Sequence, residues 1–96
     1  MPDAVLARAI ERARARFEKC KDAWKPSAGD EEVIDAAEES CQHARDALVH
    51  LQGRRWDEAD AAANLCLELE EEFGSGRVWR DFALLIEEAA AVGRAA

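Results

Sequence analysis

The residue types best suited to chemistry gather between residues 39 and 50, where the sequence holds two histidines, a cysteine and two carboxylates. A zinc site usually takes Cys-x-x-Cys or His-x-x-x-His pairs, and the chain contains neither. A di-iron bundle needs Glu-x-x-His motifs on two helices. Glu39 and His43, like Asp46 and His50, lie four residues apart, which is typical of ordinary contacts along one helix. We therefore predict no metal ion and no cofactor in this protein.

The three cysteines are an odd number, which argues against a closed disulfide framework and favours a reducing compartment. Cys20, Cys41 and Cys66 each fall in an apolar stripe, so we expect buried thiols, with a redox pair left open if two stripes meet at one level. Nucleophilic catalysis needs a cysteine beside a histidine, whereas Cys41 and His43 point to different faces of a helix. The Gly-Ser-Gly run at 74–76 lacks the Lys and Ser/Thr of a phosphate-binding loop. We predict that the protein is not an enzyme.

Charge is distributed unevenly along the 96 residues, which carry a net charge of −8. Residues 1–26 hold seven basic and four acidic side chains, whereas residues 27–96 hold six basic and seventeen acidic ones. A net charge of +3 over the first segment is weak beside a true basic arm, so we expect no direct contact with nucleic acid. The first segment docks on the acidic remainder in one interpretation and contacts an external anion in another.

The acidic residues offer the better functional lead. A negative field repels nucleic acid and attracts basic protein surfaces, although such residues also serve simply to keep a small protein in solution. We therefore predict that a partner protein with a basic surface contacts two acidic clusters, which are Glu31, Glu32, Asp35, Glu38 and Glu39 in the first and Glu70, Glu71 and Glu72 in the second.

Apolar residues recur at steps of three and four in four segments, the spacing of amphipathic helices. The stripes run over residues 6–24, 34–51, 56–73 and 78–92. Pro26 should stop the first helix at Trp24, and Gly53 should close the second, which Ser27 or Asp30 can cap. We expect Ser75 to cap the fourth helix, with Gly93 beyond its end.

No window shows the alternation of a strand, and short connections favour antiparallel neighbours. The sequence thus predicts an all-α protein, a compact antiparallel bundle of about four helices forming a single domain over residues 1–96. Small Ala and Cys residues in the stripes should let the helices approach closely. The wider layers should be filled by aromatic side chains, namely Phe17, Trp24, Trp56, Phe73 and Phe82.

The fourth helical segment is apolar around most of its circumference, from Val78 to Ile86. Such a helix is either central to a core or covered by a partner, and we favour a second buried face made by another protein or by a homodimer. Trp79 lies between Arg77 and Arg80, a combination of residue types that dominates binding energetics. We therefore add Trp79 to the predicted contact residues, with packing over one end of the bundle as the alternative.

One local stretch, from Leu48 to Ala59, resembles the helix-turn-helix joint of a tetratricopeptide repeat. In that family a glycine ends the first helix, as Gly53 does here, and an aromatic-acidic-acidic-Ala run opens the second, as at Trp56-Asp57-Glu58-Ala59. The match covers about a dozen residues, and arrays of this family need about three stacked units. The resemblance implies a helical hairpin.

In size, acidity and absence of motifs the chain is also similar in kind to helical anti-CRISPR and other phage anti-defence proteins. We predict a non-enzymatic inhibitor or decoy, an acidic bundle that occupies a basic, nucleic-acid-binding surface of a partner protein. The alternative is an adaptor or secretion-chaperone module that binds a partner helix through the tetratricopeptide-like hairpin and the fourth helix. With no leader sequence and no apolar run long enough to span a bilayer, we expect a cytoplasmic protein that has no membrane partner.

Overall fold

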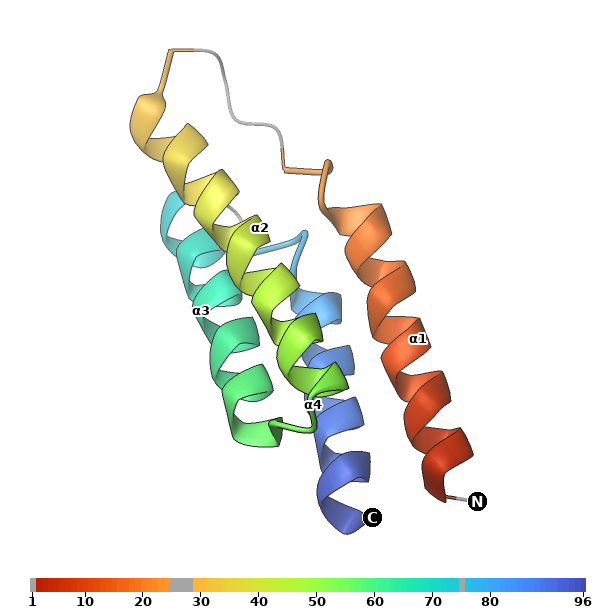
Figure 1. Ribbon diagram of the computed structural model, residues 1–96. Helices are drawn as coiled ribbons and strands as arrows, with labels where there is room; N and C mark the ends of the chain where they lie inside the picture. Colours follow the sequence, from red (N-terminus) through yellow and green to blue (C-terminus); the bar gives the residue numbers. More distant parts are fainter. Residues whose placement is uncertain (1, 25–28, 75) are drawn as a thin grey trace.

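The computed structural model describes residues 2–24, 29–74 and 76–96. Within these ranges the chain forms four helices and no strand, which confirms the predicted all-α bundle (Figure 1). The helices are α1 (Pro2–Cys20), α2 (Glu31–Gln52), α3 (Trp56–Phe73) and α4 (Arg80–Ala95). None of the helices in this part of the chain is both long enough and apolar enough to cross a membrane.

The helices run alternately up and down the long axis of a molecule that measures 49 × 21 × 18 Å (Figure 1). α2 packs extensively on α3, whereas α4 packs on both α3 and α1. α1 touches α2 only lightly, and in the described residues it makes no contact with α3. α4 therefore contacts all three other helices, as α2 also does, although the sequence led us to expect a partner to cover the second apolar face of α4.

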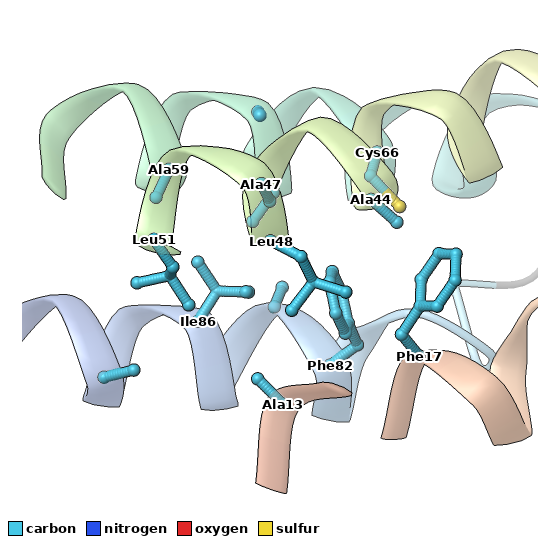
Figure 2. Packing of buried hydrophobic residues seen from close by; sticks show 14 of the residues in the cluster. Ala13, Phe17, Ala44, Ala47, Leu48, Leu51, Ala59, Cys66, Phe82 and Ile86 are labelled. Atoms are coloured by element: carbon cyan, nitrogen blue, oxygen red, sulfur yellow. The ribbon is translucent and has the colours of Figure 1, made fainter. Parts of the chain in front are cut away.

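The core combines small residues on facing helices with a few large side chains (Figure 2). Ala13 of α1 and Ala44 and Ala47 of α2 are fully buried, and small side chains at such positions let neighbouring helices pack closely. The predicted aromatic layer is confirmed for Phe17 and Phe82, which are buried, whereas the other three predicted members, Trp24, Trp56 and Phe73, are only half-buried.

Two helix boundaries agree with the sequence-based expectation. The Asp30 carboxylate caps α2 by accepting a hydrogen bond from the Val33 N–H at 3.2 Å, while the other predicted cap, Ser27, lies outside the described residues. Gly53 directly follows the last residue of α2 and caps the helix, as expected. The left-handed backbone conformation at this turn belongs to Arg54, with φ 58°, rather than to the glycine.

Three other boundaries differ from the expectation. α4 begins at Arg80 instead of directly after its predicted cap, Ser75, which itself lies outside the described residues. α1 ends at Cys20 instead of Trp24, because the Ala23 N–H bonds to the Cys20 carbonyl in a tight turn; Pro26 is outside the described residues. Gly93 lies inside α4 instead of beyond it, and a Cβ at this position would come within 2.5 Å of the Trp56 ring. Only a glycine lets the indole of Trp56 pack directly on the α4 backbone.

Candidate functional site

The first predicted acidic cluster is presented to solvent. All five of its carboxylates lie in the first half of α2, and all are exposed. Only Glu39 has a charged or titratable partner among the described residues, because His43 Nε2 approaches its carboxylate at 3.6 Å. This half of α2 therefore forms an uninterrupted acidic surface.

The α2–α3 register brings further carboxylates to the same end of the bundle. The buried hydroxyl of Ser40 donates a hydrogen bond to the Cys66 carbonyl at 2.9 Å, so these two residues lie at one level of the antiparallel pair. Counting outward from this bond places Glu68 level with Glu38, and Glu72 about one turn further toward the start of α2. Both glutamates are exposed. We define the acidic patch by the residues from both helices, which are Glu31, Glu32, Asp35, Glu38, Glu39, Glu68 and Glu72.

Glu70 belongs to the second predicted cluster but is not part of this surface. It is 1% exposed, and its carboxylate accepts hydrogen bonds from the backbone N–H groups of Val78 at 2.9 Å and Trp79 at 2.8 Å. The prediction that Glu70 contacts a partner is therefore wrong for this structure. A buried carboxylate needs such donors, and Glu70 uses them to hold the chain just before α4.

Trp79 is likewise placed in the core, with 1% of its surface exposed. Its ring packs 5.4 Å from Phe82 in an edge-to-face arrangement and 5.9 Å from Phe17. The prediction that Trp79 contacts a partner is wrong, and the alternative of packing over one end of the bundle is closer to the structure. Burying the large indole outweighs the influence of the two flanking arginines, because an aromatic side chain gains most from leaving water.

The connection before α4 is held by two further interactions. The Cys20 thiol donates to the Val78 carbonyl at 3.2 Å, which links the end of α1 to the start of α4. Gly76 is buried with a φ of 69°, a conformation that a residue with a side chain rarely adopts. Together with Glu70, these contacts define a structural cluster rather than a surface for binding.

Glu71, the middle member of the predicted run, is neither buried like Glu70 nor free of an ion pair like Glu72 in the described residues. It is exposed, and its carboxylate comes within 3.7 Å of Arg80 at the start of α4. An exposed ion pair of this length contributes little to stability, but it partly neutralises the charge of Glu71. The acidic patch is therefore best represented on α3 by Glu68 and Glu72. Glu68 was missed as a contact residue because only the α2–α3 register brings it level with the first cluster.

Charge is segregated between α1 and α3, whose described backbones are not direct neighbours in the bundle. α1 holds five basic and three acidic residues, whereas α3 holds seven acidic residues and no Lys or Arg. The arginines of α1 approach α4 instead, through Arg12 to Glu88 at 3.4 Å and Arg16 to Asp81 at 4.0 Å. These exposed pairs fit the interpretation in which the first helix docks on the acidic body.

The histidines and cysteines considered as metal ligands or nucleophiles lie in surroundings that do not favour such chemistry. His50 Nδ1 accepts a hydrogen bond from Arg55 at 3.0 Å. In the residues that the structure describes, no three His, Cys, Asp or Glu side chains lie close enough together to hold one metal ion. Cys20 and Cys66 are buried as expected, whereas Cys41 is half-buried, and all three are free thiols. Burial raises the pKa of the Cys66 thiol far above its ordinary value, so this sulfur is a poor nucleophile at neutral pH.

No protein-family model matches the chain, and neither a curated protein nor a solved structure is similar to it. The resemblance of residues 48–59 to a tetratricopeptide joint stays a prediction. In the structure this stretch contains the end of α2, the turn at Arg54 and the start of α3. The functional argument therefore depends on the geometry of the acidic patch.

Proposed function

We propose that the protein is a non-enzymatic inhibitor or decoy that binds the basic, nucleic-acid-binding surface of a partner protein through the acidic patch. The observation that carries this proposal is the presence of exposed carboxylates from two separate sequence clusters at the same level of the α2–α3 pair. Carboxylates held on a rigid helical surface can occupy sites where a partner otherwise binds phosphates, since both present anionic oxygens to Lys and Arg. The likeness in kind to anti-CRISPR proteins is part of this proposal.

The distribution of the compensating charge supports the same proposal. Arg12 and Arg16 of α1 pair with carboxylates of α4, and no ion pair among the described residues joins α1 to the acidic patch, which is therefore largely unscreened in this part of the chain. A field of one sign over a compact surface accelerates encounter with an oppositely charged partner. It acts over a Debye length of about 8 Å at physiological salt, so binding of this kind weakens as salt rises. The free thiols suit the reducing cytoplasm, where we place the interaction.

The adaptor alternative depended on an apolar outer face of α4, and so did a homodimer through that helix. Phe82, Ile86 and Ala89 are fully buried against the other helices, so most of the apolar circumference of α4 is used within the chain. Leu84 remains 57% exposed on the outer side. A single exposed leucine is ordinary for a protein surface and gives a partner helix little area to bury.

The proposal is tested with a variant that reverses one carboxylate on each helix of the acidic patch, Glu38→Lys with Glu68→Lys. A protein captured from the host with the immobilised wild-type chain is loaded with labelled nucleic acid, and displacement of that nucleic acid is measured. We expect the wild-type chain to displace it at low salt. The patch variant should need at least about tenfold more protein, a change equivalent to about 1.4 kcal/mol.

The matched control reverses two exposed carboxylates outside the acidic patch, Glu11→Lys with Glu87→Lys, and changes the net charge by the same amount. It should displace the nucleic acid nearly as well as the wild type. Equal losses in both variants would indicate a general effect of net charge. The proposal fails if the patch variant competes as well as the wild type, or if no captured partner loses its nucleic acid.

A further inference from the structure

A groove runs between the segment that follows α1 and the first half of α2, beside the acidic patch. Its volume is about 270 Å³, and its lining residues are Lys21, Trp24, Ile34, Ala37, Glu38 and Cys41. This volume lies just below the range of pockets that hold drug-sized ligands, about 300–1,000 Å³, so it suits one or two side chains of a partner. Trp24, Ile34, Ala37 and Cys41 are all half-buried, which leaves apolar surface in contact with solvent.

One wall of the groove is the Trp24 side chain, which packs against the chain at Gly74. A Cβ on Gly74 would lie 3.1 Å from two carbons of the Trp24 indole, so the ring packs closely on the chain at the end of α3. The opposite wall belongs to α2, which packs extensively on α3. The groove is thus already formed between two supported walls, and a partner would bind it without first ordering them.

The rim of the groove carries negative charge on the α2 side. Glu38 belongs both to the groove lining and to the acidic patch, and Asp35 and Glu31 lie one and two turns before it on the same exposed face. On the opposite rim the Lys21 ammonium is paired with the Glu18 carboxylate at 2.8 Å, which also raises the pKa of Lys21. The positive charge of that rim is therefore partly neutralised, and the groove is apolar within and acidic along its α2 edge.

We infer that the groove binds a basic amphipathic segment of the partner protein. An apolar side chain of that segment would enter between Trp24 and Ile34, while its Lys or Arg residues would pair with Glu31, Asp35 and Glu38. Helix-in-groove recognition commonly combines such an apolar anchor with charges at the rim, and buried anchors supply most of the binding energy. The inference rests on the proposed function, and it identifies which edge of the acidic patch the partner contacts and with what chemistry.

The test uses three synthetic helical peptides as probes, one of Leu and Lys in an amphipathic pattern, one with Ser in place of Leu, and one with Glu in place of Lys. Affinity is measured with labelled peptides, and the site is located by the NMR signals of the three Trp indole N–H groups. The Leu/Lys peptide should bind at least about tenfold more tightly than either other peptide and should shift the Trp24 signal, while the signal of buried Trp79 stays in place.

Two variants narrow the site to the groove. Ala37→Gln fills the groove without removing a core contact, and Trp24→Ala removes one wall. Each should weaken binding of the Leu/Lys peptide about tenfold and leave the weak binding of the Ser/Lys peptide unchanged. The matched control is Leu65→Ala, which removes a 46% exposed side chain on α3, outside the groove. This control should bind both peptides as the wild type does, and thermal unfolding checks that each variant is folded.

The outcomes separate this inference from the proposed function. Equal affinity for the Leu/Lys and Ser/Lys peptides, or for the Leu/Lys and Leu/Glu peptides, overturns the inference about the groove. Unchanged binding by folded Ala37→Gln does the same. In each case the displacement of nucleic acid by the acidic patch remains a separate measurement. If the Leu/Lys peptide binds in the groove but no captured partner loses its nucleic acid, the proposed function fails and the groove still binds basic amphipathic segments.

Discussion

The inner and outer sides of α3 use the same residue type in opposite ways. On the inner side, Glu70 is buried and accepts two backbone hydrogen bonds that hold the start of α4. On the outer side, Glu68 and Glu72 face solvent two residues before and after it. The inner carboxylate serves the fold, and the outer ones are available to a partner. In an acidic protein, the number of glutamates therefore says less about binding than the direction in which each one points.

Removal of the inner carboxylate should give the largest effect on stability. Glu70→Ala leaves the N–H groups of Val78 and Trp79 without their acceptor, and the Trp79 donor is buried. We expect the free energy of unfolding to fall by about 3 kcal/mol, measured by urea denaturation. Glu72→Ala is the matched control and should change it by less than about 0.5 kcal/mol. Similar values for the two variants would abolish the distinction between the two sides of α3.

A second group on the inner side of α3, the Cys66 thiol, should make the folded protein less stable at alkaline pH. Desolvation, and next the nearby Glu70 carboxylate, raise the pKa of Cys66 well above its ordinary value of 9.0. Above that pH the unfolded chain loses the thiol proton while the folded protein keeps it, so the free energy of unfolding falls as pH rises. One group of this kind contributes about 1.4 kcal/mol per pH unit. Urea denaturation at increasing pH measures this slope, which Cys66→Ala should reduce.

An independent check compares the thiols of Cys41 and Cys66. Cys41 is half-buried beside the groove, whereas Cys66 is 1% exposed. Alkylation of the native protein, followed by mass spectrometry, should modify Cys41 first and Cys66 only when the chain unfolds. Modification of Cys66 at the rate of Cys41 would contradict its place on the inner side.

Neutralising the outer carboxylates should have the smallest effect on the free energy of unfolding, and it should raise this free energy instead of lowering it. Glu68 and Glu72 are four residues apart on one exposed face, a spacing at which like charges destabilise a helix. Glu68→Gln with Glu72→Gln should therefore raise the free energy of unfolding by about 0.3 kcal/mol at low salt, and less at high salt. Thermal unfolding at two salt concentrations measures this, with Glu11→Gln on the basic helix α1 as the control. A loss of stability would mean that the patch has a structural role.

The helices themselves could largely be predicted from the sequence. Their periodicity and Gly53 gave both ends of α2 and α3 closely, because these signals are local. The start of α4 could not be found in this way. Val78 and Trp79 continue its apolar spacing, yet they lie before the helix because Glu70, eight and nine residues earlier, binds their N–H groups. The spacing of apolar residues carries no information about these hydrogen bonds to Glu70.

The site was predicted in part. The exposure of the α2 carboxylates follows from the cost of burying a charge, and the structure agrees. The inward position of Glu70 had a signal that we did not use, since it lies four residues after Cys66 in the apolar stripe of α3. Three consecutive residues span about 200° of a helix circumference, so Glu70, Glu71 and Glu72 do not all point in the same direction. The groove had no such signal, because its walls come from helices whose spacing only the fold determines.

The arrangement of the chain ends determines how this protein can be attached to something else. α1 begins and α4 ends at the same end of the bundle, and the first half of α2, with the acidic patch, lies at the other (Figure 1). A tether at either terminus, whether a solid support or a further stretch of polypeptide, would point the patch and the groove away from the attachment. Two tethers would do so as well, since both would leave from the same end of a molecule 49 Å long.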